Sequence, residues 1–124
     1  MISNSLCKGE RLRGERVISN LFERGNTFFL FPYKVFWTKI PETCDFPIRF
    51  AVSVPKRRFK RAVKRNLMKR RIREAFRTNK QILNAAVADG QIQMIAIYAS
   101  DQILPFVELE NSMKRLLQRI VQTV

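Results

Sequence analysis

The 124-residue chain has 24 Lys or Arg and 10 Asp or Glu residues, a formal net charge of +14, and no histidine. Its length suits one domain, residues 1–124, and its 46% hydrophobic content with ten Phe excludes a disordered basic tail. Without histidine, Ser-His-Asp and Cys-His nucleophile pairs and Cys2His2 zinc sites are excluded.

The N-terminal region predicts neither an export signal nor a membrane span. The longest strongly apolar stretch, Phe28 to Trp37, is interrupted by Pro32 and Lys34 and is shorter than the roughly 20 residues that cross a bilayer. We therefore expect a cytoplasmic protein with no membrane partner and with residues 1–12 flexible. Its two cysteines, Cys7 and Cys44, are expected to be free thiols, because a domain of this size needs no disulfide.

The first half of the chain predicts a helix followed by two strands. Apolar residues at helical spacing indicate a helix from about Glu15 to Arg24, with Gly25 as its C-terminal stop. Thr27 to Lys39 is rich in aromatic and β-branched residues and reads as a strand, in which Pro32 predicts an edge or a bulge. Ile48 to Val54 reads as a second strand that ends at a proline.

The second half predicts a basic helix, a strand and a last helix. The Asp89-Gly90 turn precedes a third, central strand from Ile92 to Tyr98. A final helix begins near Pro105, a residue that suits a first helical turn, and continues to Val121. The order α-β-β-α-β-α, with no repeat or linker, predicts one α+β domain with helices against a small sheet.

Almost the entire positive excess lies in one segment. Residues 56–80 hold 13 Lys or Arg and the single acid Glu74, a net charge of +12, whereas the other 99 residues carry only +2. The segment also has an apolar stripe at spacings of three and four, typical of an amphipathic helix. The stripe consists of Val63, Leu67, Met68, Ile72, Ala75 and Phe76.

A row of cations accompanies this stripe at successive i to i+4 positions. The row consists of Arg61, Arg65, Lys69, Arg73 and Arg77. Like charges in such a row repel one another, so its density makes sense if a polyanion neutralises it, and guanidinium groups suit phosphate because they bind it bidentately. The apolar stripe is narrow and is needed for a core, which favours nucleic acid over a lipid surface.

The remaining chemistry predicts no catalytic or metal-binding residues in this chain. Glu108 and Glu110 are two apart on a helix and point away from each other, and no spacing suggests a carboxylate pair or a metal site. The four glycines form no phosphate-binding fingerprint. If the protein takes part in catalysis, another molecule supplies the reacting groups.

Aromatic residues crowd the first predicted strand, and a strand presents alternate side chains to one face. They are Phe28, Phe29, Phe31, Tyr33, Phe36 and Trp37. Some could stack on single-stranded nucleic acid, although most are expected to fill the core.

The stretch from Arg49 to Arg77 resembles the protein subunit of bacterial ribonuclease P. That family has a strand, a basic pair, and then a helix with a characteristic pattern of Ala, Arg, Asn, Lys, Glu and Phe. The residues that match the pattern at its spacing are Ala62, Arg65, Asn66, Lys69, Arg70, Arg73, Glu74 and Phe76. A weaker similarity covers nearly the whole chain.

The resemblance implies a small α+β sandwich like a ribosomal-protein domain. Helices would pack on a mainly antiparallel sheet of about four strands, of α-β-β-β-α-β-α type, with an unusual left-handed βαβ crossover. It also implies a monomeric protein within a ribonucleoprotein endonuclease. The catalytic RNA, which holds the magnesium, would remove the 5′ leader from precursor tRNA, and this protein would bind both the catalytic RNA and the leader.

The resemblance assigns residues to each role. The basic helix would contact RNA through Arg61, Lys64, Arg65, Asn66, Lys69, Arg70, Arg73 and Arg77. The leader would lie in a cleft between the first helix and the sheet, at Ile18, Phe22, Phe36, Ser53, Lys56 and Arg57.

Two positions depart from the family pattern. Leu67 replaces the last Arg of the family's Arg-Asn-Arg signature, for which Arg71 or Lys64 would compensate, and Ile18 replaces an aromatic residue in the cleft. Two other functions fit the charge and size: a structural ribonucleoprotein component such as a small ribosomal protein, and a duplex-DNA binder that places the helix in a major groove.

Overall fold

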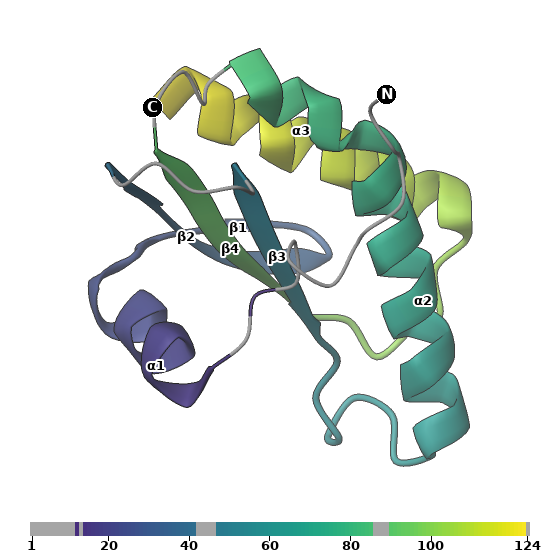
Figure 1. The fold of residues 1–124 in the computed structure, drawn as a ribbon. Helices are drawn as coiled ribbons and strands as arrows, with labels where there is room; N and C mark the ends of the chain where they lie inside the picture. The colour runs from purple at the N-terminus through teal and green to yellow at the C-terminus, as the bar shows by residue number, and fades with distance from the viewer. Residues whose placement is uncertain (1–11, 13, 42–46, 86–89, 124) are drawn as a thin grey trace.

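The computed structural model describes residues 12, 14–41, 47–85 and 90–123 (Figure 1). Its elements are α1 (Glu15–Arg24), β1 (Asn26–Leu30), β2 (Tyr33–Ile40), β3 (Ile48–Ser53), α2 (Ala62–Asn79), the 3-10 helix η2 (Lys80–Ala85), β4 (Gln91–Tyr98) and α3 (Phe106–Thr123). This is the α-β-β-β-α-β-α order of the expected α+β fold. Cys7, Cys44 and Asp89 lie outside the described residues, as does most of the segment 1–12.

The four strands form one mixed sheet in the order β1-β2-β4-β3. β1 pairs with β2, and β2 with β4, in antiparallel fashion, whereas β3 and β4 are parallel and are joined through α2. The sheet is therefore mainly antiparallel, as expected. Figure 1 shows α1 on one face of the sheet and α2 with α3 on the other.

The predicted strand from Thr27 to Lys39 is two strands, not one. The ladder of β1 and β2 ends at the pair Leu30 and Tyr33, and the chain turns at Phe31 and Pro32. Because proline has no N–H to donate, it cannot continue a ladder through a central strand. Pro32 thus marks a hairpin turn rather than a bulge.

The main core lies between the sheet and the helix pair α2 and α3. The rings of Phe50 on β3 and Phe76 on α2 stack at a centroid distance of 4.0 Å and an interplanar angle of 3°. On the other side of this core, the Tyr33 hydroxyl donates a hydrogen bond of 3.0 Å to the Leu109 carbonyl of α3. Both helices are therefore attached to particular strands.

The apolar stripe of α2 is confirmed at Met68, Ile72, Ala75 and Phe76, all of which are buried. It was wrong at Val63, which is 79% exposed. Nine residues separate Val63 from Ile72, or about two and a half turns, so the two side chains point to opposite sides of the helix. Spacings of three and four that accumulate over several turns do not preserve a single face.

A smaller core lies under α1, where Leu21 and Ile95 are buried with Leu12. The Leu12 N–H donates a hydrogen bond of 2.9 Å to the Phe50 carbonyl, so the chain is attached to β3 at the last residue of the segment expected to be flexible. In the described part of the chain, no helix is long and apolar enough to span a bilayer.

Two glycines occupy positions where the Cβ atom of any other residue would clash with the backbone. Gly25 ends α1 as predicted, with extended rather than left-handed backbone, and an added Cβ would lie 2.4 Å from the Leu21 carbonyl oxygen. Gly90 has a φ of +94°, and a Cβ there would lie 2.1 Å from the Ile40 carbonyl oxygen. Each allows two backbone segments to approach closely.

The buried Tyr33 hydroxyl makes the free energy of unfolding fall at alkaline pH. Burial, with Tyr98 as a second cause, raises its pKa above the ordinary value of 10.0. The stability that the protonated hydroxyl contributes is thus fully present below about pH 10. It is lost as the pH rises further, because the hydroxyl ionises at a lower pH in the unfolded chain than in the folded one. We expect Tyr33→Phe to cost about 1 kcal/mol near neutral pH through the lost hydrogen bond.

We also expect the variant's free energy of unfolding to decline less steeply above about pH 10, by up to about 1.4 kcal/mol per pH unit. Urea unfolding of both proteins across this range measures the difference. Parallel curves would show that the Tyr33 hydroxyl titrates alike in the folded and unfolded chains.

Candidate nucleic-acid interface

The cations of α2 do not share one face of the helix. Each i to i+4 step turns about 40° around the axis, so the row that starts at Arg61 winds around the helix by its end at Arg77. Arg61, Lys64, Arg70 and Arg73 are exposed, whereas Arg65, Lys69 and Arg77 are half-buried. Asn66 is exposed. Thus the outward face in the middle of α2 consists of Asn66, Lys69, Arg70 and Arg73.

Arg65 has an intramolecular role that its spacing did not reveal. Its Nη1 donates to the carbonyl oxygens of Phe59 and Lys60, each at 2.8 Å. These bonds attach the loop before α2 to the first turn of the helix. Similarly, Arg71, suggested as a substitute for the missing family Arg at Leu67, donates at 3.3 Å to the Leu104 carbonyl.

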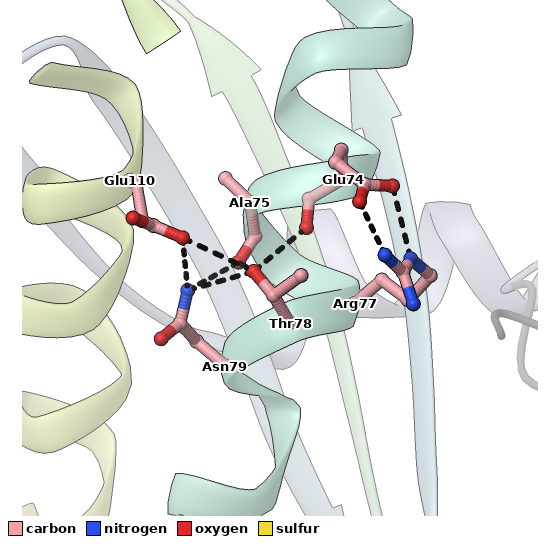
Figure 2. Close-up of polar contacts among 6 residues, drawn as sticks. All are labelled: Glu74, Ala75, Arg77, Thr78, Asn79 and Glu110. Atoms are coloured by element: carbon pink, nitrogen blue, oxygen red, sulfur yellow. Dashed lines mark hydrogen bonds and ion pairs between the residues drawn. The ribbon is translucent and has the colours of Figure 1, made fainter. Parts of the chain in front are cut away.

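The C-terminal end of α2 is held by polar contacts on two sides (Figure 2). Toward α3, the Glu110 carboxylate accepts hydrogen bonds from Thr78 at 3.2 Å and from Asn79 at 3.3 Å. On the side away from α3, Arg77 Nε donates to Glu74 at 2.9 Å. The hydrogen bond from Arg77 lowers the pKa of the Glu74 carboxyl. Arg77 is therefore less available to a ligand than Arg70 or Arg73.

A basic groove of about 600 Å³ lies at the N-terminal end of α2. It is lined by Arg58, Phe59, Lys60, Arg61, Lys64, Asp101, Gln102 and Ile103. Asp101 is its only acid and pairs with Arg58 at 3.1 Å. The first turn of α2 has no acidic residue, and its N-terminus has no side-chain cap. The helix dipole and three further cations therefore make this groove attractive to phosphate.

A second surface, here called the sheet platform, is formed on the α1 face of the sheet. Directly opposite residues of paired strands share a face, so Phe36 lies in one row with Ile95 and Ala51. The next row holds Phe29, Lys34, Ile97 and Ser53. The platform is therefore apolar with one cation, unlike α2.

The structure brings together three of the predicted cleft residues, Ile18, Phe22 and Phe36. The rings of Phe22 on α1 and Phe36 on β2 meet edge to face with centroids 4.9 Å apart, and Phe22 is 42% exposed. Ile18 packs partly buried in the same cluster. Ser53 ends β3 in the neighbouring row, and the exposed Lys56 and Arg57 follow in the next turn.

Sequence reasoning missed Lys34 and Ile97 as members of this platform. It named Phe29 among the aromatic residues that could stack on single-stranded nucleic acid but did not place it in the cleft. Phe29 is 55% exposed, and the Lys34 ammonium lies 5.4 Å from the centroid of the Phe36 ring. Their alignment depends on the pairing of β1 with β2. The sequence predicted one strand in place of these two, so it could not predict the pairing. The alternative of core packing is correct for Tyr33 and Trp37, which are buried.

Three kinds of comparison relate the chain to known proteins. A family model described as Ribonuclease P matches residues 6–121. The ribonuclease P protein component of Porphyromonas gingivalis is 37% identical over 121 residues, which cover 96% of this chain and 88% of that relative. The same component of Chlorobaculum tepidum is 33% identical over 138 residues, covering 98% of this chain and 89% of the relative.

Solved structures show the same fold. The RNase P protein from Thermotoga maritima superposes with a TM-score of 0.71 at 25% identity, over 89% of this chain and 96% of that one. The Staphylococcus aureus RNase P protein gives a TM-score of 0.66 at 22% identity, over 91% and 96% of the two chains.

The closely spaced cations of α2 should cost stability in the free protein. Replacing both Lys69 and Arg73 with Gln keeps a similar helix propensity and removes like-charge contacts, so we expect the free energy of unfolding to rise by about 0.5 kcal/mol. The control is Arg77→Gln, which loses the Glu74 pair and should give no gain. Urea unfolding at low salt measures both, and a destabilised double variant would contradict the repulsion argument.

Proposed function

This chain belongs to the ribonuclease P protein family, and we propose that it binds the catalytic RNA of ribonuclease P through α2 and the 5′ leader of precursor tRNA through the sheet platform. It is thus the protein component of a bacterial tRNA-processing ribonucleoprotein. The observation that carries the finer proposal is the presence of two surfaces of different chemistry on different elements. One is cationic and helical, and the other is apolar and aromatic.

The outward face of α2 suits the backbone of a folded RNA. Arg70 and Arg73 are exposed, and Lys69 lies beside them. Such side chains release counterions from RNA phosphates, which gives affinity without reading the sequence and makes binding depend strongly on salt. The basic groove extends this surface at the N-terminal end of the helix, where the dipole adds to the attraction of Lys60, Arg61 and Lys64.

The sheet platform suits a single strand. Phe22 and Phe29 offer exposed aromatic rings, and the half-buried Ile18 and Ile97 add apolar surface. Bases of any identity can stack on such rings, which fits a leader of variable sequence. Lys34 lies in the platform, and the exposed Lys56 and Arg57 follow the end of β3. These cations would neutralise the leader's phosphates.

In this proposal the RNA holds the magnesium that cleavage requires. Within residues 12, 14–41, 47–85 and 90–123, no three His, Cys, Asp or Glu side chains are close enough to hold a metal ion, so these residues do not fit a magnesium site of their own. The protein's contribution is to lower the repulsion between two polyanions, the catalytic RNA and its substrate. No side chain of this protein is assigned a chemical step.

The decisive test is cleavage of precursor tRNA at low magnesium by a bacterial ribonuclease P RNA. We expect the protein to raise the rate, and the triple variant of Lys69, Arg70 and Arg73 to Gln to lose most of the stimulation because it binds the RNA less tightly. Arg65 is left intact because it holds the loop before α2. A protein that gives no stimulation would support a structural ribonucleoprotein component or a duplex-DNA binder instead.

The leader role is tested separately at Phe22. Stacking of a base contributes about 1–3 kcal/mol, so Phe22→Leu should weaken holoenzyme binding of leader-bearing precursor by about fivefold or more. Binding of mature tRNA should not change. Phe22→Tyr keeps the ring and should preserve precursor binding. An equal loss for precursor and mature tRNA would contradict a leader contact at this residue.

A further inference from the structure

A third surface lies apart from α2 and the sheet platform. A groove of about 540 Å³, here called the hairpin groove, separates the turn of β1 and β2 from the first half of α3. It is lined by Leu30, Phe31, Pro32, Leu104, Glu108, Asn111, Ser112 and Arg115. Its volume lies in the range of sites that hold small molecules.

The groove combines an apolar floor with unused polar groups. Leu30 and Leu104 are half-buried, whereas the Phe31 side chain is 56% exposed at the rim. In the described part of the chain, the side chains of Glu108, Asn111 and Arg115 form no hydrogen bond or ion pair, although all three line one groove. Glu108 lies in the first turn of α3, where a carboxylate interacts favourably with the helix dipole. All three side chains are exposed, so their hydrogen-bonding atoms remain available to a ligand.

The two walls of the groove are fixed relative to each other. The hydrogen bond from the Tyr33 hydroxyl to the Leu109 carbonyl joins the start of β2 to α3. Further along α3, the Arg119 guanidinium lies 4.5 Å from the centroid of the Phe28 ring on β1. A ligand would thus meet a preformed site and would not have to order it, which favours binding.

The charge around the groove points to RNA as the source of the ligand. Among the described residues that line the groove, Glu108 is the one acid and Arg115 the one cation, and Arg119 lies about one turn beyond Arg115 on the same side of α3. The Glu108 carboxylate repels a phosphate and is unsuited to bind one. It is well placed to accept hydrogen bonds from a base whose own phosphate lies on the neighbouring cations.

We propose that the hairpin groove binds an unpaired guanine of RNA. The base stacks on Phe31, the Glu108 carboxylate accepts from the N1–H and N2–H groups of guanine, and Arg115 binds the adjoining phosphate. Cytosine offers this carboxylate only its amino group, and adenine likewise presents no pair of adjacent donors. This site goes beyond the proposed function and does not depend on it, because it lies on a different face of the protein from the leader platform.

The test is a titration of the free, full-length protein with guanosine monophosphate, cytidine monophosphate or inorganic phosphate at constant ionic strength, followed by amide NMR spectra. We expect the guanine nucleotide to shift the amides of Leu104, Asn111 and Ser112, and to bind at least about fivefold more tightly than the cytosine nucleotide. Inorganic phosphate should shift only amides near α2. The same map for all three compounds would overturn the proposal.

Two phenylalanines provide a matched control. Phe29 and Phe31 are two residues apart and exposed to 55% and 56%, but Phe29 lies on the sheet platform and Phe31 lines the groove. Phe31→Ala should weaken binding of the guanine nucleotide at the groove by about fivefold or more, and Phe29→Ala should leave it unchanged. Equal effects of the two variants would overturn the assignment.

Glu108→Gln keeps the size of the side chain and tests the proposal even if Phe31→Ala fails to fold. We expect it to abolish the preference for guanine over cytosine, and an unchanged preference would overturn the role of Glu108. Phe31→Ala then shows which RNA supplies the base. A weaker affinity for the catalytic RNA would identify that RNA, and a higher Michaelis constant of the holoenzyme for precursor tRNA would identify the substrate. If neither changes, the groove does not serve an RNA ligand.

Discussion

The stacking of Phe76 on Phe50 holds the most highly charged element of the chain against its sheet. The segment 56–80, which contains α2, carries most of the protein's positive charge. The helix has only a narrow apolar face, so its position depends on a few buried side chains in its last three turns. Polar contacts from Glu110 to Thr78 and Asn79 hold the same end. The N-terminal end, which carries Arg61 and Lys64, consequently needs no apolar residues for packing and can consist almost wholly of cationic residues.

The sheet separates this charged element from an apolar one. Because β4 lies between β2 and β3 and is buried on both faces, it supplies side chains to the main core and, through Ile95 and Ile97, to the α1 face. α1 covers only part of that face. The uncovered row forms an apolar platform, while the cationic surface lies on α2. Two surfaces of different chemistry thus occur on one small domain without sharing side chains.

The arrangement also explains which predictions failed. Helical spacing identified α2 and its buried residues from Met68 onward, because packing there follows the helix period. It failed at Val63, because the first turn of the helix extends past the core. It also did not reveal the hydrogen bonds of Arg65, because these depend on the loop before the helix. It also could not show that Phe29 joins the cleft predicted at Phe22 and Phe36. That alignment comes from strand pairing, which a linear pattern does not contain.

The amino-acid sequence by itself determined the domain class, the concentration of charge on one helix, the positions of most helices and strands, and the family resemblance. These properties depend on local periodicity, turn residues and composition, all of which act over a few neighbouring residues. Only the tertiary structure decided which cations face solvent, which aromatic residues share the platform, and that the turn at Phe31 and the start of α3 enclose a groove. Those outcomes depend on contacts between residues far apart in the chain, whose geometry is set by the packing of the whole sheet.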